Sequence, residues 1–187
     1  MSSERPFTAD DYQRALEEGD RWIEVVAGRL VRLSPPDELH GNVVRNLAKA
    51  LGAFLRQHPV LYPCFELGLI VARQPDTIRC PAISCFSMAD GLAQMGLLVT
   101  DRKPELIVEV ASSNDRRESM AQRVREYQQW GVPAIWVFDP VSLHAHVFHR
   151  GALPQMLKAA ETLHGCFELA GFHVSVGEQF ADPKWAR

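Results

Sequence analysis

The segment that constrains the fold most lies between residues 106 and 138. Leu106–Val110 is a nearly continuous apolar run, which is typical of a strand covered on both faces of a sheet. Residues 115–130 follow, and their apolar side chains recur at helical spacing until Gly131 and Pro133 end the pattern. Residues 134–138 form a second apolar run. The order strand, helix, strand predicts a right-handed βαβ crossover with two parallel strands at the centre of a sheet.

The rest of the chain alternates between helical and strand patterns. Helices are expected over residues 8–19, 38–57 and 87–94, and a β-hairpin over residues 22–33. Further strands are expected over residues 60–65, 67–72, 78–86, 145–148 and 172–176. This pattern predicts an α/β (mixed α+β) fold: a central mixed sheet flanked by helices, with an N-terminal helix and hairpin. Because neither a repeat nor a linker interrupts it, we expect residues 1–187 to form a single domain.

Charge and hydropathy exclude several classes of function. The 187 residues carry 20 Lys plus Arg against 23 Asp plus Glu, a net charge of −3, so tight sequence-independent coating of DNA is disfavoured. The chain has neither an apolar signal-peptide core nor the ~18 consecutive apolar residues of a membrane span. We therefore expect a cytoplasmic protein with no membrane partner. The four cysteines form no CxxC pair, which favours free thiols over a zinc site.

Two glutamates interrupt strand-like runs and are therefore candidates for a site. Glu109 lies inside Leu106–Val110, where a carboxylate is unfavourable unless it is paired, hydrogen-bonded or bound to a metal. A strand-end glutamate that reaches solvent or pairs with an arginine is an equally plausible interpretation. Glu24 lies between Ile23 and Val25, where an exposed position on an edge hairpin is the better explanation when Glu24 is considered alone.

Five segments extend the pattern around these glutamates. They are residues 22–30 with Glu24, Ser34-Pro35-Pro36 with His40, residues 78–84, residues 104–112 with Glu109, and Tyr127 with residues 131–140. In this order and spacing the chain, from about residue 7 to residue 180, resembles a bacterial family of putative restriction endonucleases. That family is a branch of the PD-(D/E)XK nuclease superfamily.

The resemblance implies a restriction-endonuclease-like core in which acidic residues of adjacent central strands bind Mg²⁺ or Mn²⁺ beside a lysine. Such a cation neutralises charge on the attacked phosphate of DNA and supplies hydroxide near neutral pH. By this resemblance Glu109 occupies the second acidic position, and the backbone carbonyl of Val110 is a further metal ligand. Glu24 and His40 match positions near the same pocket.

Two positions depart from the family pattern. Ala82 stands where the family has the first metal-binding aspartate, and its methyl group cannot ligate a cation. Arg123 stands where the family has its lysine; an arginine keeps the charge but cannot act as a general base, although it can hold a phosphate through two hydrogen bonds. Asp115 does not fill the vacancy, because it is better explained as the N-cap of its helix.

These departures leave two functions open. One is a metal-dependent DNA endonuclease with an impaired active site, in which Arg123 substitutes for the lysine. The other is an inactive nuclease-fold module for binding nucleic acid or protein, and in either case we expect a homodimer.

Two smaller clusters have simple alternative explanations. Arg116 and Arg123, two helical turns apart, could follow a phosphate backbone, but a solvated helix face explains most such clusters. His144 and His146 could begin a metal site, although a solvent-facing edge strand is favoured.

Overall fold

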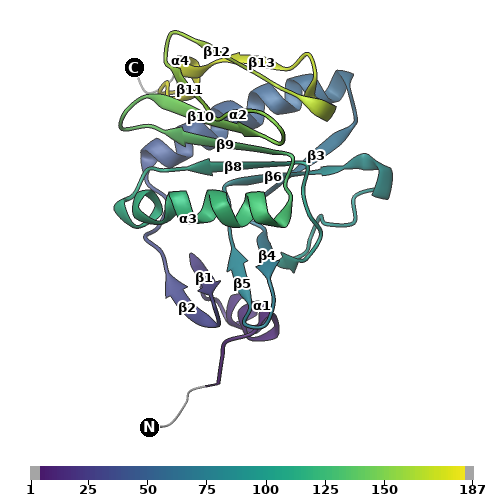
Figure 1. Ribbon diagram of the computed structural model, residues 1–187, viewed down its shortest axis with the longest axis vertical. Coiled ribbons are helices and arrows are strands. Elements are labelled where there is room, and N and C mark those ends of the chain that lie inside the picture. The colour runs from purple at the N-terminus through teal and green to yellow at the C-terminus, as the bar shows by residue number, and fades with distance from the viewer. Residues whose placement is uncertain (1–4, 184–187) are drawn as a thin grey trace.

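The computed structural model describes residues 5–183 and, within this range, every side chain except that of Asp90. Two β-sheets lie one above the other in Figure 1, and the helix between them, α3 (Asn114–Trp130), contributes side chains to the upper core and to the space between the sheets. The other helices are α1 (Ala9–Glu17), α2 (Glu38–Gln57) and the single turn α4 (Val176–Gln179).

The upper sheet has six strands and contains the predicted βαβ crossover. Its order is β11 (Gln155–Lys158), β10 (His144–His149), β9 (Ala134–Asp139), β8 (Leu106–Val110), β6 (Ile83–Ser87) and β3 (Leu61–Phe65). β8 and β9 are parallel and the other neighbours are antiparallel, so the sheet is mixed as expected.

Side chains alternate across β8 and so divide the upper core between two helices. Val108 and Val110 lie on the side of α2, in one core cluster with Leu47 and Leu51. Ile107 lies on the opposite side, in the cluster that includes Tyr127 of α3. Because successive side chains of a strand point to opposite faces, Glu109 lies on the α3 side with Ile107.

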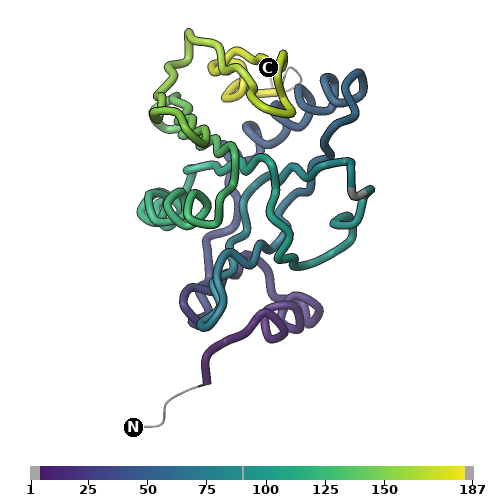
Figure 2. The backbone as a smooth tube through the Cα atoms, turned by 45° about the vertical axis from the view of Figure 1, so that its right-hand side comes forward, coloured from purple at the N-terminus to yellow at the C-terminus, as the bar shows by residue number. Residues whose placement is uncertain are grey.

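The lower sheet brings the N-terminal hairpin beneath α3. Its order is β2 (Arg29–Arg32), β1 (Ile23–Val26), β5 (Thr77–Arg79), β4 (Gly68–Ala72) and β7 (Val99–Thr100). α1 packs against this sheet through Tyr12, while β12 (Thr162–His164) and β13 (His173–Ser175) form a small separate sheet. Figure 2 shows α1 at one end of the molecule and these C-terminal strands at the other, above α2.

Three expectations about local structure were wrong. Residues 78–86 are not one strand: the chain leaves the lower sheet after β5 and enters the upper sheet at β6. Pro81 has no N–H for a ladder, and the N–H of Cys80 donates to Glu24 instead of to a strand. Residues 87–94 form a 3₁₀ turn, Met88–Asp90, followed by turns rather than a helix. The N-cap of α3 is Ser113; the Asp115 carboxylate accepts from the N–H of Ser34 at 2.7 Å.

Within residues 5–183, no helix is both long enough and apolar enough to cross a membrane.

Candidate functional site

The candidate site is a buried network of charges between the two sheets, and its centre is Glu24. One Glu24 oxygen accepts from Arg123 Nη1 at 2.7 Å and the other from Arg123 Nη2 at 2.8 Å, so the guanidinium binds the carboxylate with two parallel hydrogen bonds. Arg79 Nη1 also donates to Glu24, at 3.0 Å. The backbone N–H of Cys80 is a further donor to Glu24, at 2.8 Å. Glu24 is fully buried because β1 lies between β2 and β5, so the expected exposed position on an edge strand was wrong.

Glu109 joins the same network from β8. Its Oε1 atom accepts from the Tyr127 hydroxyl at 2.7 Å and lies 3.3 Å from Arg123 Nη1. Its Oε2 atom is buried and has no hydrogen-bond partner among the residues that the structure describes. Glu109 is therefore a buried, arginine-paired carboxylate, and one of its two oxygens is unsatisfied.

Arg123 holds the network together. It is fully buried in the middle of α3, and its Nε atom donates to Ser119 Oγ at 3.0 Å. Burial by itself would lower the pKa of Arg123, but attraction to Glu109 and Glu24 outweighs burial and raises that pKa above its ordinary value. Arg123 therefore stays charged at all ordinary pH values and cannot accept a proton from water.

Arg79 connects this centre to the surface of α3. Its Nε and Nη2 atoms bind the Glu126 carboxylate at 2.6 and 3.0 Å. Attraction to Glu126 and Glu24 outweighs the effect of burial, so the pKa of Arg79 is also raised. Sequence reasoning missed Arg79, although its place two residues before Pro81, beside the suspected site, was an available signal.

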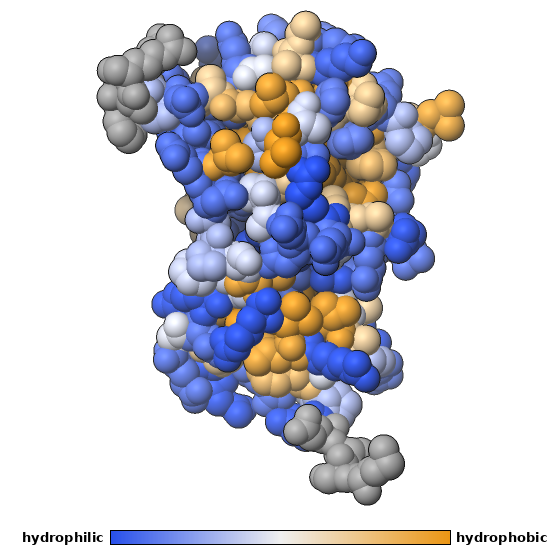
Figure 3. Space-filling model, turned by 90° about the vertical axis from the view of Figure 1, so that its left-hand side faces the viewer, coloured by the Kyte–Doolittle hydropathy of each residue, from blue (hydrophilic) through white to orange (hydrophobic). Residues whose placement is uncertain are grey.

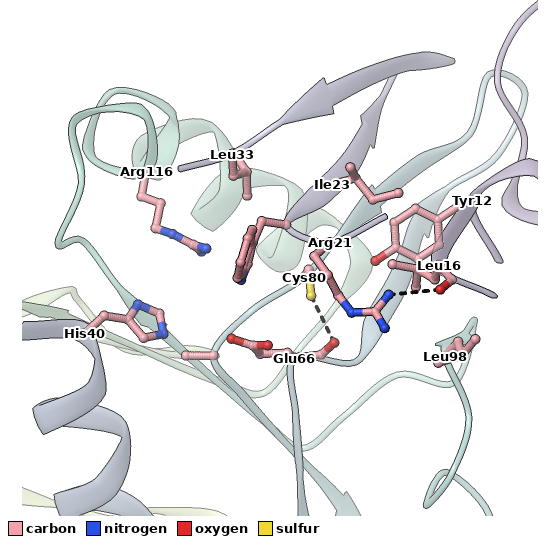
Figure 4. A pocket seen from close by; sticks show the side chains of 12 residues that line it. Tyr12, Leu16, Arg21, Ile23, Leu33, His40, Glu66, Cys80, Leu98 and Arg116 are labelled. Atoms are coloured by element: carbon pink, nitrogen blue, oxygen red, sulfur yellow. Dashed lines mark hydrogen bonds between the residues drawn. The ribbon is translucent and has the colours of Figure 1, made fainter. Parts of the chain in front are cut away.

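Ala82 and His40 line a separate cavity of about 250 Å³ next to this network (Figure 4). Neither Glu24, Glu109 nor Arg123 lines it. His40 is only 3% exposed and its Nδ1 atom has no hydrogen-bond partner among the described residues. Burial, with a smaller contribution from the charge of Arg116, lowers the pKa of His40 to about 4, so the imidazole is neutral at pH 7.

The residues present do not fit the divalent cation that the resemblance implies. Ala82 offers a methyl group, and both Glu24 oxygens already accept from arginines. Glu109 Oε2 is the one free carboxylate oxygen of the pair, and the neighbouring guanidinium of Arg123 repels a cation. Within residues 5–183, no group of three His, Cys, Asp or Glu side chains is arranged to hold a metal, and this includes His144 and His146.

The structure thus brings Glu24, Glu109 and Arg123 together and puts His40 and Ala82 in the adjoining cavity. The catalytic and metal-binding roles expected for these residues, and the metal-binding role expected for the Val110 carbonyl, stay predictions. Arg116 is 4% exposed and Arg123 is fully buried, so a solvated helix face does not describe these two arginines.

A solved structure resembles this chain over nearly its whole length. It is a crystal structure described as a putative nuclease belonging to DUF820 from Anabaena variabilis; the TM-score is 0.77 at 14% sequence identity, covering 94% of this chain and 98% of that one. A likeness at this identity shows the fold, and it confirms the expected nuclease-like arrangement of a mixed sheet and helices. No curated protein matches the chain.

A protein-family match includes the residues of both the charged network and the cavity. The model of the Uma2 family, described as "Putative restriction endonuclease", matches residues 9–177, a span that contains every site residue named above. The chain therefore belongs to this family of putative restriction endonucleases.

Proposed function

We propose that this protein binds DNA through its nuclease fold and that its capacity to hydrolyse phosphodiesters is impaired. The observation that carries the proposal is the two-bond contact between Arg123 and Glu24, at 2.7 and 2.8 Å, with Glu109 beside it. In this arrangement the guanidinium of Arg123 contacts both carboxylates, and Arg79 adds a second positive charge at Glu24. An exchangeable cation therefore meets two fixed guanidinium groups, and Glu109 Oε2 is the one oxygen of the two carboxylates that is free to bind it.

The chemistry of the individual groups supports the same proposal. Hydrolysis needs a group that takes a proton from water near neutral pH. Arg123 holds its proton too strongly, and both Glu24 oxygens are occupied by hydrogen bonds. Neutral His40 has a free ring nitrogen, but it lines the adjoining cavity, which neither carboxylate lines.

Support for DNA as the partner comes from the family and from surface arginines. Arg29 and Arg32 are exposed on β2, and both line a second cavity, of about 330 Å³, between the hairpin and α3. The guanidinium of Arg32 binds Asp20 through two hydrogen bonds, so Arg29 is the better candidate for a phosphate contact. The side of the molecule that lies at the left of Figure 1, where this hairpin is found, carries many hydrophilic side chains around an apolar cluster in its lower half (Figure 3). Arginines at such a surface suit the phosphate backbone of DNA.

DNA binding is tested with a fluorescent dumbbell duplex, which is closed by a loop at each end and therefore has no strand ends. We expect binding that weakens linearly in a plot of log affinity against log salt concentration. The Arg29→Gln variant should reduce the slope by about 0.9 if Arg29 contacts one phosphate. Absence of binding at low salt would contradict the proposal.

Hydrolysis is tested by incubating supercoiled plasmid with Mg²⁺ or Mn²⁺. We expect no nicking by the wild-type protein, and Mg²⁺-dependent nicking by the double variant Ala82→Asp, Arg123→Lys, which supplies the missing carboxylate and lysine. Robust wild-type cleavage that Glu109→Gln abolishes would show an active enzyme and refute the impairment.

One observation favours a weakly active metal-dependent endonuclease as a second candidate. The unpartnered Oε2 atom of Glu109 is a buried acceptor that a cation could satisfy. This alternative predicts that Mn²⁺ raises the melting temperature of the wild-type protein and that Glu109→Gln removes the increase.

We also propose that the protein forms a homodimer. Sedimentation equilibrium of the full chain tests this proposal, and a mass of one chain at all concentrations contradicts it.

A further inference from the structure

The cavity beside Ala82 contains a buried positive charge that forms no ion pair with an acidic side chain of the described residues. Arg116 is 4% exposed, yet no carboxylate of the described residues forms an ion pair with it, and its buried Nε atom has no hydrogen-bond partner among them. The other buried arginines, Arg79 and Arg123, each contact carboxylates. A buried charge is unfavourable unless it is paired, so an anion that binds Arg116 would be stabilised there.

The direction of the side chains shows where that anion would lie. Arg116, from the first turn of α3, and His40, from the first turn of α2, both point into the cavity in Figure 4. His40 adds a ring with an unpartnered nitrogen, and the methyl of Ala82 leaves this wall free of negative charge. This side of the cavity therefore presents a guanidinium and an imidazole, neither of which forms an ion pair with an acidic side chain among the described residues.

The opposite side of the cavity is partly apolar. Leu16, Ile23, Leu33 and Leu98 line it, and Arg21, an exposed residue, lies there with its guanidinium held by the carbonyl oxygens of Leu16 and Asp20. A ligand that fills this cavity needs an anionic end and a less polar body. At about 250 Å³ the cavity is smaller than most drug-sized sites, which limits the ligand to roughly one nucleotide.

We infer that this cavity binds a phosphate monoester with a small organic body, that is, a mononucleotide or the 5′-phosphorylated end of a DNA strand. The guanidinium of Arg116 would hold the phosphate, because its planar fork matches two phosphate oxygens. The choice of a nucleotide among phosphate esters rests on the proposed function; the demand for an anion rests on Arg116 alone.

One acidic side chain opposes such a ligand. The carboxylate of Glu66 lines the same cavity and points into it in Figure 4, but Glu66 is exposed, so solvent screens its charge. The thiol of Cys80 donates to the Glu66 backbone carbonyl at 3.0 Å; burial raises the pKa of this thiol to about 12, which keeps it neutral. Removing the Glu66 charge should therefore strengthen anion binding, and removing the Arg116 charge should weaken it.

The test is isothermal titration calorimetry of the full chain with thymidine 5′-monophosphate, and with thymidine as the uncharged control. We expect the monophosphate to bind at least about tenfold more tightly than thymidine, since hydrogen bonds to charged groups are worth this much or more. Arg116→Gln should remove that preference. The matched control Arg125→Gln, which changes an exposed arginine of the same helix, should leave affinity within about twofold.

Glu66→Gln provides an independent variant if Arg116→Gln does not fold, and it should bind the monophosphate more tightly than the wild type does. Equal affinity for thymidine and its monophosphate, or unchanged affinity in Arg116→Gln, would overturn the inference, as would weaker binding by Glu66→Gln. A 5′-phosphorylated oligonucleotide, compared with its 5′-hydroxyl form, distinguishes a strand end from a free nucleotide as the source of the phosphate.

The failure of this inference is distinguishable from the failure of the proposed function. The dumbbell duplex has no 5′ end, so its binding tests DNA recognition without this cavity, whereas the monophosphate tests the cavity without a duplex.

Discussion

Replacing Arg123 by methionine should expose how much the buried network contributes to stability. The change leaves Glu24 with donors from Arg79 and Cys80, and leaves Glu109 with only the Tyr127 hydroxyl. Removing one partner of a buried ion pair typically destabilises a protein by about 3–5 kcal/mol. Because Glu24 keeps two donors, we expect the lower end of this range, ~3 kcal/mol, which still leaves a typical domain folded.

The assay is urea unfolding at 25 °C and pH 7.5, followed by circular dichroism. Arg125→Met is the matched control, because Arg125 is exposed on the same helix, and it should change the free energy of unfolding by less than about 0.5 kcal/mol. The variants Arg123→Met and Glu24→Gln, alone and together, complete a double-mutant cycle. Two residues joined by two hydrogen bonds should be coupled by about 2 kcal/mol.

Two results would refute this reasoning. A loss below about 1 kcal/mol in Arg123→Met would mean that the carboxylates are hydrated or paired in another way. Additive effects in the cycle would mean that the contact between Arg123 and Glu24 contributes nothing beyond packing.

Three further predictions concern neighbouring groups. The pKa of His40 falls from 6.5 in the unfolded chain to about 4 in the folded protein, so the unfolded state binds more protons between these two values. The free energy of unfolding should therefore decline by ~3 kcal/mol as the pH drops from 6.5 to 4. His40→Gln should lack this pH-dependent decline in urea unfolding measured at a series of pH values. Tyr127→Phe removes one of the two donors to Glu109 and should lower the free energy of unfolding by about 1–2 kcal/mol, whereas an unchanged value would show that water replaces the hydroxyl. Mn²⁺ should leave the melting temperature of the wild-type protein unchanged and raise that of Ala82→Asp, Arg123→Lys; equal responses would mean that position 82 does not limit cation binding.

Local patterns predicted the centre of the upper sheet well, because β8, α3 and β9 follow one another in sequence, whereas the edge strand β11 was not expected and β6 was merged with β5. The apolar run at 106–110, the helical stripe and Gly131 were enough to place β8, α3 and β9, and the parallel pairing of β8 with β9 confirms the crossover. The alternation of side chains along β8 also assigns Glu109 to the face opposite Val108 and Val110.

The candidate site was only partly predictable, because its contacts join distant segments. Glu24 is buried by β5, more than 50 residues later, and binds an arginine 99 residues away. The expected exposure of Glu24 treated the hairpin as an edge, and nothing within the hairpin reveals its second neighbour. Arg116 is polar and lies at a helix start, where solvent exposure is the usual outcome. It is buried beside a cavity whose other walls come from distant segments, among them His40 of α2 and Ile23 of β1.

Ala82, Arg123 and Arg116 bear most directly on which ions this region can bind. A metal-dependent site needs excess negative charge, which the cation neutralises when it binds. Here Arg123 and Arg79 provide part of that neutralisation permanently, and an aspartate at position 82 would add a carboxylate to the cavity that Arg116 lines, where it would offset the charge of that guanidinium. With alanine at that position, the guanidinium of Arg116 gives the adjoining wall of the cavity a positive charge. The missing carboxylate at position 82 therefore disfavours a cation and at the same time makes the cavity suitable for an anion. The phosphate proposal and the impaired hydrolysis thus have one physical cause.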